Sequence, residues 1–207
     1  MKGADMLLYQ AARGANVRRL IIYMAEKGID IPRHDVDVEG GEHKRPEFLA
    51  MNPTGRVPVL RTDDGRFLFE SAAIMEYLEE LHPDPPMIGT TPEERARVRA
   101  VERIANDLIV RCNLWFLHSH PRFAGRGEQN PVVAEAARLW AGELLVALDR
   151  CARADAFLAG GRPSIADCSL FALLQNCRQL FGIAIADDLD GINAWYARFG
   201  ERPSTAY

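Results

Sequence analysis

The sequence predicts an α/β domain followed by an all-helical domain. Three observations lead to this fold class: residues 1–82 alternate short apolar strands with helical segments, residues 83–90 contain prolines that interrupt a helix, and residues 91–207 have helical apolar spacing almost throughout. We therefore expect a first domain over residues 1–82, a linker over 83–90 and a helical domain over 91–207. A chain of 207 residues has room for two such units and a sizeable core.

The chain begins with a strand, a helix and a second strand. Met6–Tyr9 is a short apolar strand, and the helix after it spaces its apolar residues at i, i+3, i+4 and i+7. These residues are Val17, Leu20, Ile21 and Met24. Gly28 is the expected end of the helix. His34–Val38 alternates polar and apolar residues, which predicts a half-buried strand, and two strands joined through a helix pair in parallel.

A hairpin and a helix complete the first domain. Residues 40–51 are expected to form a loop with a short helix. The strands Val57–Arg61 and Arg66–Phe69 then flank an Asp-Gly pair, which is a hairpin signal. Ser71 is the expected N-cap of a helix whose apolar residues recur at helical spacing. The predicted order of elements is therefore β-α-β-loop-β-β-α.

Two capping patterns mark helix starts in the second domain. The run Thr-Pro-Glu-Glu at residues 91–94 combines a cap, a proline at the first helical position and a glutamate three residues after the cap. Ser164 and Asp167 form a second capping box, in which we expect the Asp167 carboxylate to serve folding and not catalysis. We expect the helices to break at residues 118–130 and 155–163, where proline and glycine occur.

Composition and charge exclude several classes of function. The net charge of −4 and the absence of a long basic run argue against nucleic acid as a partner. We expect a cytoplasmic protein with no membrane partner, because the sequence contains neither an apolar run of membrane-spanning length nor an N-terminal signal region. The four cysteines lie in the second half and form no C-x-x-C, so neither a zinc site, nor a disulfide framework, nor thioredoxin-type thiol chemistry in the first domain is expected.

Two short stretches carry binding chemistry. An X-Pro bond is the one kind of peptide bond that is held cis at low cost, and Val57-Pro58 opens a predicted strand. A cis bond at this position would turn the Val57 N–H and C=O away from the sheet, where they can bind the backbone of a ligand. Ser71 lies at a helix N-terminus that suits a carboxylate, and Glu70 beside it suits an ammonium group. Together these residues fit a small zwitterionic peptide.

The same stretches resemble a known family. The patterns N-P-x-G-x-V-P-x-L at residues 52–60 and E-S-x-A-I-x-x-Y-L at residues 70–78 are similar to those in the thioredoxin-like half of the cytosolic glutathione S-transferases. The resemblance covers nearly the whole chain and implies a thioredoxin-like first domain, glutathione as co-substrate and a homodimer. It also implies that the Val57 backbone, held by a cis Pro58, binds the cysteinyl backbone of glutathione, and that Glu70 and Ser71 hold its γ-glutamyl end.

The resemblance also suggests which residue stabilises the glutathione thiolate. Residues 10–17 contain no Ser, Thr or Cys, and Asn16 lies where an asparagine-type, Nu-like group of bacterial and fungal members has its asparagine. That group shares the pattern G-E-H-[KR]-x-P-E-F, which here is residues 41–48. The resemblance implies that two residues of this pattern, His43 and Lys44, contact the glycyl end or the cysteinyl backbone of glutathione.

The chain departs from this group at one position. Gly14 stands where some members have a hydroxyl residue, which leaves the origin of thiolate stabilisation open. Our hypothesis is that the Asn16 amide N–H₂ and the N–H groups of the helix N-terminus donate to the sulfur. Tyr9 is the competing donor, because residues 9–14 are similar to the tyrosine-type pattern Y-x-x-x-R-G.

The function that follows is that of a glutathione S-transferase, which joins the thiolate to a small apolar electrophile, typically in detoxification. Asn113, Trp115 and Phe116 on the first long helix are candidates for the wall of the second-substrate site. Two alternatives stay open: a glutathione-dependent disulfide or peroxide reductase, and a non-catalytic binding or scaffolding module. We expect no metal, since His118 and His120 lack a nearby third ligand.

Overall fold

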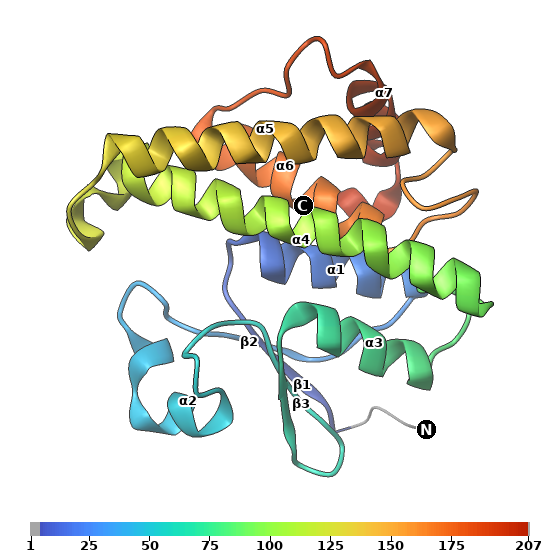
Figure 1. The fold of residues 1–207 in the computed structure, drawn as a ribbon. Helices are drawn as coiled ribbons and strands as arrows, with labels where there is room; N and C mark the ends of the chain where they lie inside the picture. Colours follow the sequence, from blue (N-terminus) through green and yellow to red (C-terminus); the bar gives the residue numbers. More distant parts are fainter. Residues whose placement is uncertain (1–4, 207) are drawn as a thin grey trace.

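A computed structural model describes residues 5–206 of the chain (Figure 1). A mixed sheet with three flanking helices forms the N-terminal part, and two long helices with two shorter ones form the C-terminal part. The N-terminal elements are β1 Leu7–Gln10, α1 Ala15–Lys27, β2 Arg33–Asp35, η1 Glu42–Lys44, α2 Pro46–Met51, β3 Val59–Arg61, β4 Phe67–Phe69 and α3 Ser71–Leu81. The C-terminal elements are α4 Pro92–Ser119, η2 Pro121–Arg126, α5 Pro131–Ala154, α6 Ile165–Phe181, α7 Asp190–Gly200 and η3 Pro203–Thr205.

The sheet has the strand order β2-β1-β3-β4, in which β1 pairs with β2 in parallel and with β3 in antiparallel fashion. This arrangement confirms the predicted order of elements and the thioredoxin-like class of the first domain. The prediction that the second strand covers His34–Val38 is wrong, because β2 ends at Asp35. The reason is that its neighbour β1 ends at Gln10, whose carbonyl accepts from the Val36 N–H at 2.7 Å and leaves the residues beyond without a strand to pair with.

The two faces of the sheet are covered by different helices (Figure 1). Leu8 and Leu60 point into the large core beneath α1 and α3, whereas Tyr9 and Val59 face a smaller cluster that includes Phe48 of α2. This alternation is the expected period of two along a strand.

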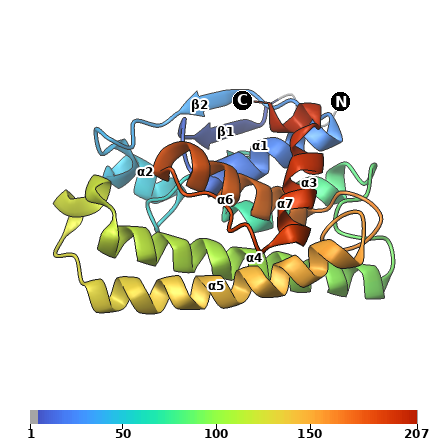
Figure 2. The same ribbon diagram turned by 90° about the horizontal axis from the view of Figure 1, so that it is seen from above.

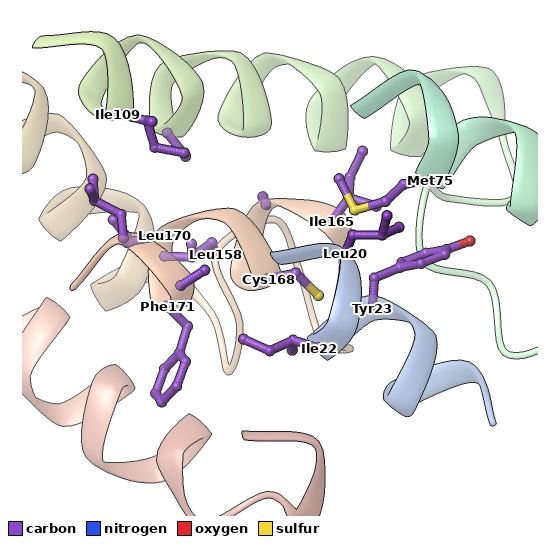
Figure 3. Packing of buried hydrophobic residues seen from close by; sticks show 14 of the residues in the cluster. Leu20, Ile22, Tyr23, Met75, Ile109, Leu158, Ile165, Cys168, Leu170 and Phe171 are labelled. Carbon is purple, nitrogen blue, oxygen red and sulfur yellow. The ribbon is translucent and has the colours of Figure 1, made fainter. Parts of the chain in front are cut away.

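The centre of the molecule is α6. Every residue of this helix from Ile165 to Gln175 is buried, and the helix packs on α1 on one side and on α4 on the other. Figure 2 shows α6 lying between the sheet and the long pair α4 and α5. In Figure 3 the side chains of α1, α3 and α4, among them Leu20, Met75 and Ile109, gather around it. The two parts of the chain consequently share one core.

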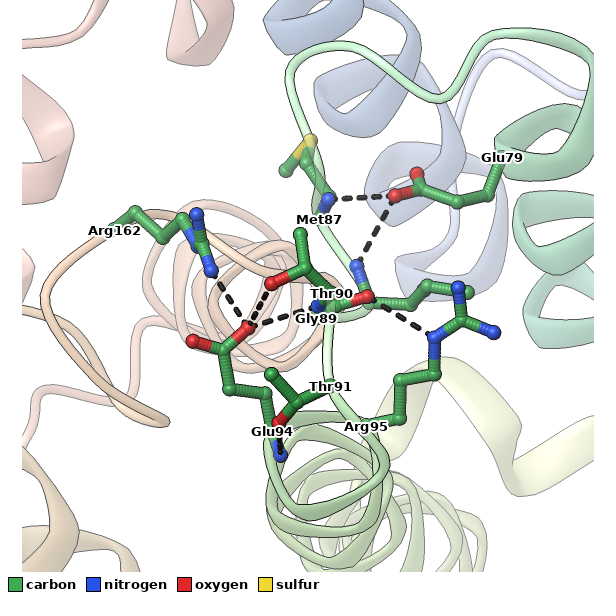
Figure 4. Close-up of polar contacts among 9 residues, drawn as sticks. Glu79, Met87, Gly89, Thr90, Thr91, Glu94, Arg95 and Arg162 are labelled. Carbon is green, nitrogen blue, oxygen red and sulfur yellow. Dashed lines mark hydrogen bonds and ion pairs between the residues drawn. The ribbon is translucent and has the colours of Figure 1, made fainter.

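The segment between the two parts is held by one buried carboxylate. Oε1 of Glu79 accepts from the backbone N–H of Met87 at 2.7 Å and of Ile88 at 3.3 Å (Figure 4). Its Oε2 accepts from the Tyr23 hydroxyl and from Lys27 Nζ, each at 2.7 Å. Burial and the Glu79 hydrogen bond raise the pKa of Tyr23. The proline-rich connection is therefore an ordered part of the fold.

The structure confirms both capping patterns and corrects two details of the helix ends. Thr91 Oγ1 accepts from the Glu94 N–H at 3.2 Å, and the Ser164 and Asp167 side chains form the reciprocal capping box. Ser71 is not an N-cap: the cap position belongs to Glu70, with no capping side-chain hydrogen bond, and the Ser71 hydroxyl is bound elsewhere. Sequence patterning also missed the irregular segment 182–189 between α6 and α7, where Ile183 and Ile185 gave an apparently continuous apolar pattern.

Candidate functional site

The N-terminus of α1 has backbone donors that the helix itself does not use. Gly14 occupies the N-cap position with φ 129°, a conformation that favours glycine, and provides no side-chain cap. The first intrahelical bond runs from the Arg18 N–H to the Gly14 carbonyl at 2.9 Å. The N–H groups of Ala15, Asn16 and Val17 therefore have no partner within the helix, and they form the positive end of its dipole. Such an end stabilises an anion such as a thiolate.

The side chain of Asn16 adds a further donor at this end of α1. Its Oδ1 is buried, and the amide forms no hydrogen bond with any other residue between 5 and 206. Because the N–H₂ group makes no hydrogen bond within these residues, it is available to donate to a ligand at the helix N-terminus. On the helix, Asn16 shares one face with Arg19 and Tyr23, which follow it by three and seven residues.

That face of α1 contacts α3, and the contacts align the two helices. Arg19 Nε donates to Oγ of Ser71, the first residue of α3, at 2.7 Å. Tyr23 binds Glu79, which lies near the end of α3. The two helices therefore run in the same direction, and both N-termini open at the same end of the molecule. Asn16 precedes Arg19 by one turn, about 4.5 Å along the axis, so it lies near the start of α3.

Arg19 also joins this site to the helical part. Its Nη1 forms an ion pair with Glu102 of α4 at 2.9 Å and lies 3.3 Å from the Ser169 hydroxyl of α6. The Arg19 side chain is 2% exposed. Burial lowers the pKa of Arg19 and raises that of Glu102, while their mutual attraction opposes both changes. The sequence reading missed Arg19, although an arginine among the buried positions of an amphipathic helix is itself a signal of a specific partner.

The peptide bond between Val57 and Pro58 is cis, as predicted. The Val57 N–H and C=O form no hydrogen bond outside the strand pairing within residues 5–206, so they are available to a ligand backbone. Asn52, which is 1% exposed, shapes the turn before the proline: its Nδ2 donates to the Arg56 carbonyl at 2.7 Å and its Oδ1 accepts from the Thr54 N–H at 3.0 Å. The sequence pattern N-P-x-G includes Asn52 but does not by itself indicate that its side chain holds this turn.

The loop around η1 packs against this turn. Lys44 Nζ donates to the Gly55 carbonyl at 3.0 Å. A Cβ at Gly55 would lie 2.8 Å from the His43 carbonyl, so this close approach requires glycine. Nδ1 of His43 is buried without a hydrogen-bond partner, and burial together with Lys44 and Arg126 lowers the pKa of His43. The imidazole of His43 and the ammonium group of Lys44 thus lie beside the turn that precedes Val57.

Glu70 has an unusual backbone conformation at the start of α3. Its φ of 67° is the one positive value found at a non-glycine position in residues 5–206. Such a conformation costs about 1–3 kcal/mol and is kept where the surrounding structure or a function requires it. The side chain is exposed, and its charge contributes to the electrostatic environment of Arg19. Glu70 therefore presents a free carboxylate next to the N-terminus of α3.

Tyr9 lies on the other side of the sheet from α1. Its ring packs against His34 at 5.4 Å and Phe67 at 6.3 Å between centroids, beside the cluster around Phe48. Asn16 extends from the N-terminal turn of α1, on the opposite face. The structure thus separates the two candidate thiolate donors.

The three candidates for the second-substrate wall occupy different surroundings. Asn113 is exposed and follows Glu102 by eleven residues, three turns further along the same face of α4 that contacts α1. Trp115 instead lines an apolar cavity of about 410 Å³ between α4, α5 and α6. Phe116 is buried and stacks on Phe181 with centroids 4.3 Å apart. Of the three, Asn113 is the residue on the face of α4 that is directed toward α1.

The histidines of the H-x-H pair have structural partners. Nδ1 of His118 accepts from the Asn130 N–H, and Nδ1 of His120 accepts from the Arg122 N–H, each at 3.2 Å. Residues 5–206 contain no group of three or more His, Cys, Asp or Glu side chains placed to hold a metal ion. Within the same range, no helix combines the length and apolar character needed to cross a bilayer.

The fold and this site define a class of protein: a thioredoxin-like domain with a cis-proline peptide clamp, joined to a helical domain. Models of the glutathione S-transferase N-terminal and C-terminal domains match residues 15–81 and 131–198. The chain therefore belongs to the glutathione S-transferase family. It is a glutathione transferase, and glutathione is the co-substrate of this family.

Individual relatives support this assignment over most of their length. The chain is 35% identical to a maleylacetoacetate isomerase of Pseudomonas aeruginosa, over 87% of this chain and 84% of that protein. It is 31% identical to glutathione S-transferase 2 of Saccharomyces cerevisiae, over 96% and 87% of the two chains. Among solved structures, a glutathione S-transferase domain-containing protein of Marinobacter aquaeolei superimposes with a TM-score of 0.88 at 31% identity, covering 97% of this chain and all of that one.

Proposed function

We propose that this chain binds glutathione across the N-termini of α1 and α3 and activates its thiol for addition to a small electrophile. The Val57 backbone would pair with the cysteinyl residue, and Glu70 and Ser71 would hold the ammonium and carboxylate of the γ-glutamyl end. His43 and Lys44 would face the glycyl end, where a cation suits the second carboxylate. The shared direction of α1 and α3 supports this assignment, because one tripeptide spans both positive helix ends.

The observation that carries the catalytic proposal is the Asn16 side-chain amide at the α1 N-terminus, whose N–H₂ makes no hydrogen bond with any residue between 5 and 206. A thiol with a reference pKa near 8.5 is ionised to a few per cent at neutral pH, and a shift of about two units, worth roughly 2.7 kcal/mol, makes the thiolate dominant. Three unpaired N–H groups of α1 and the Asn16 N–H₂ can donate to the sulfur. We assign the role to Asn16 and not to Tyr9, and accordingly place the chain with the asparagine-type members of the family. Gly14 stands where some members of that group have a hydroxyl residue, and it adds no side-chain cap to the backbone donors.

An ultraviolet titration of bound glutathione tests this role. We would record the thiolate absorbance against pH for the wild type, Asn16→Ala, Asn16→Asp and Tyr9→Phe. The expected result is a thiol pKa well below the free value in the wild type and in Tyr9→Phe, and a higher pKa in both Asn16 variants. A low pKa retained in Asn16→Ala but lost in Tyr9→Phe would assign the role to the tyrosine. An unshifted thiol in the wild type would leave a binding module without catalysis.

The choice of reaction is a second question. Conjugation needs an electrophile positioned near Asn113 and the start of α1, with proximity and the thiolate supplying most of the rate. The three relatives named maleylacetoacetate isomerase, at 35%, 36% and 37% identity, favour reversible addition of the thiolate to a conjugated double bond as a second candidate. A glutathione-dependent reductase stays a third. Comparing product formation from 1-chloro-2,4-dinitrobenzene, a conjugated cis-alkenoic acid and a mixed disulfide separates the three.

The organisation of the molecule forms part of the proposal. We place the glutathione-binding domain at residues 1–82, the linker at 83–90 and the helical domain at 91–207, and we propose a cytoplasmic homodimer, as the resemblance implies. Analytical ultracentrifugation and cell fractionation test these two points. A monomer at micromolar concentration would contradict the dimer.

A further inference from the structure

Two cysteines that the proposed function does not use lie in contact within the helical part. Cys112 of α4 and Cys177 of α6 are 5% and 6% exposed, and a hydrogen bond joins their side chains. Both are free thiols. Sulfur is a soft ligand that favours soft, thiophilic atoms. Two sulfurs in contact can bind one such atom together, which a single cysteine cannot do.

Both cysteines border the apolar cavity of about 410 Å³ between α4, α5 and α6. Its floor contains buried apolar side chains, among them Leu108, Leu173 and Leu174. Its two charged lining residues, Arg138 and Asp188, are exposed and lie at the rim. This volume falls within the range of small-molecule pockets in proteins. A ligand that enters therefore passes a polar rim and reaches an apolar floor that contains two thiols.

A glycine of α5 leaves part of this space open. Gly142 lines the cavity from the interior of α5, where glycine is less favourable than alanine. Its φ is not positive, and a Cβ at this position would meet no heavy atom within 4 Å outside the local helix backbone. Neither backbone conformation nor crowding therefore requires glycine here. A larger side chain would occupy the cavity, so Gly142 preserves room for an apolar group.

The cavity and the proposed glutathione site use different faces of α4. Leu108, Cys112 and Trp115 border the cavity and recur at i, i+4 and i+7, which places them on one helix face. Glu102 and Asn113 lie on the face that contacts α1, about a third of a turn away around the helix. A ligand in the cavity therefore does not occupy the proposed position of glutathione.

Trivalent arsenic matches this pair of thiols. An organoarsenic oxide, R–As=O, condenses with two thiols: two As–S bonds form, the bonds from arsenic to oxygen break, and the two thiol protons leave with the oxygen as water. Arsenic stays trivalent, so the step needs neither an oxidant nor a reductant. The hydrogen bond with Cys177 and burial raise the pKa of Cys112, which keeps it a thiol. Disulfide exchange requires a thiolate, whereas this condensation starts from thiols.

We propose that Cys112 and Cys177 form a dithiol site for trivalent arsenic compounds that carry an apolar substituent, with the substituent seated in the cavity. The second As–S bond forms within one chain, so the pair should hold arsenic more tightly than two separate glutathione molecules do. The apolar substituent adds affinity in proportion to the area that it removes from water. The site depends neither on Asn16 nor on glutathione binding.

Phenylarsine oxide tests the proposal. Its uptake by the folded chain would be measured by intact mass in excess glutathione, for the wild type, Cys112→Ala and Cys177→Ala. The matched controls Cys151→Ala and Cys168→Ala remove a thiol that does not border the cavity. A further variant, Gly142→Leu, fills the cavity and keeps both thiols, so it tests the proposal even where an alanine variant fails to fold. Circular dichroism would establish folding in each case.

We expect about one phenylarsenic group per chain in the wild type and in both controls, and its release by 2,3-dimercaptopropanol, which offers a competing pair of thiols. Affinity should fall about a hundredfold or more in Cys112→Ala and Cys177→Ala, because the intramolecular second bond is lost. It should fall about tenfold or more in Gly142→Leu, and arsenite should bind the wild type about tenfold or more weakly than phenylarsine oxide, because neither combination buries a phenyl group.

Absence of uptake by the wild type would overturn the proposal, as would full uptake by a folded Cys112→Ala or Cys177→Ala chain. Loss of uptake in Cys151→Ala would assign the reaction to that cysteine instead. Equal affinity in the wild type and Gly142→Leu would exclude the cavity as the seat of the substituent. Glutathione affinity should be the same in all these variants, and a failure of the wild type to bind glutathione would count against the proposed function alone.

Discussion

Arg19 Nε donates to Ser71 Oγ at 2.7 Å, and this bond fixes the start of α3 to the face of α1 that carries Asn16. The same guanidinium is paired with Glu102 of α4, so one buried side chain connects α1, the N-terminus of α3 and the helical part. Ser71 accepts this hydrogen bond and keeps its own hydroxyl hydrogen available for a ligand carboxylate. The position of the serine hydroxyl is therefore fixed by the protein itself.

Breaking this contact should be strongly destabilising. Arg19→Met leaves the Glu102 carboxylate buried without its partner, and we expect a loss of about 3–5 kcal/mol in the free energy of unfolding, measured with urea. Arg19→Met/Glu102→Met removes both charges and should cost less than the sum of the single variants, by about 1–3 kcal/mol. Additive losses would show that the ion pair does not couple the two helices.

Asp167 should contribute as much to the free energy of unfolding as the Arg19–Glu102 pair, and it should have no part in glutathione binding. This fully buried carboxylate accepts from the Leu158 N–H, the Ser164 N–H and hydroxyl, and Trp195 Nε1, at 2.8–3.0 Å. Burial raises its pKa in spite of these hydrogen bonds. We expect Asp167→Ala to lower the free energy of unfolding by about 3–5 kcal/mol and Trp195→Phe by about 1–2 kcal/mol.

Glutathione affinity serves as the control for this prediction. Trp195→Phe should fold and bind glutathione with unchanged affinity, since Asp167 and Trp195 belong to the helical domain and contact none of the proposed glutathione residues. A selective loss of glutathione binding in Trp195→Phe, with stability retained, would contradict a purely structural role.

The order of elements and the cis-proline were predictable because they depend on local signals. The spacing of apolar residues predicts α1, and the Val57-Pro58 pair predicts the cis peptide bond at the start of the hairpin. What sequence alone did not provide are contacts between distant segments. Arg19 meets residues 52, 83 and 150 positions away, and no local pattern encodes such a partner. The prediction that Ser71 is an N-cap is wrong for the same reason, because the Ser71 hydroxyl accepts a hydrogen bond from the distant residue Arg19.

Stability should fall in acid through Glu26 of α1. Burial alone would raise the pKa of Glu26, but hydrogen bonds from Arg202 and Ser204 lower it below its ordinary value of 4.5. An acid with a lowered pKa in the folded state contributes stability above pH 4.5 and loses it as the pH falls through the folded pKa. We expect Glu26→Gln to cost about 1–2 kcal/mol at neutral pH, with a difference from the wild type that shrinks below pH 4.5. A constant difference across that range would exclude this ion pair as the cause.

Disulfide exchange should be confined to one of the four cysteines. Cys151 is half-buried, whereas Cys112, Cys168 and Cys177 are buried. The hydrogen bond with Cys177, together with burial, raises the pKa of Cys112, and burial raises that of Cys168, so neither forms the reactive thiolate readily. At pH 8, 5,5′-dithiobis(2-nitrobenzoate) should modify about one thiol per folded chain. Cys151→Ser should abolish this modification. Rapid modification of several thiols in Cys151→Ser would contradict the assignment of the reactive thiol to Cys151.

Glu70 provides a test that separates binding from stability. Its φ of 67° is unfavourable for a residue with a side chain, and glycine adopts it without strain. Glu70→Gly should therefore raise the free energy of unfolding by about 1 kcal/mol while it weakens glutathione binding about tenfold, because the partner of the γ-glutamyl ammonium is lost. Glu70→Gln keeps the strained backbone and should lose affinity without the gain in stability. If glutathione bound Glu70→Gly as tightly as the wild type, the carboxylate would have no part in the clamp, and the strain at this position would need a structural explanation.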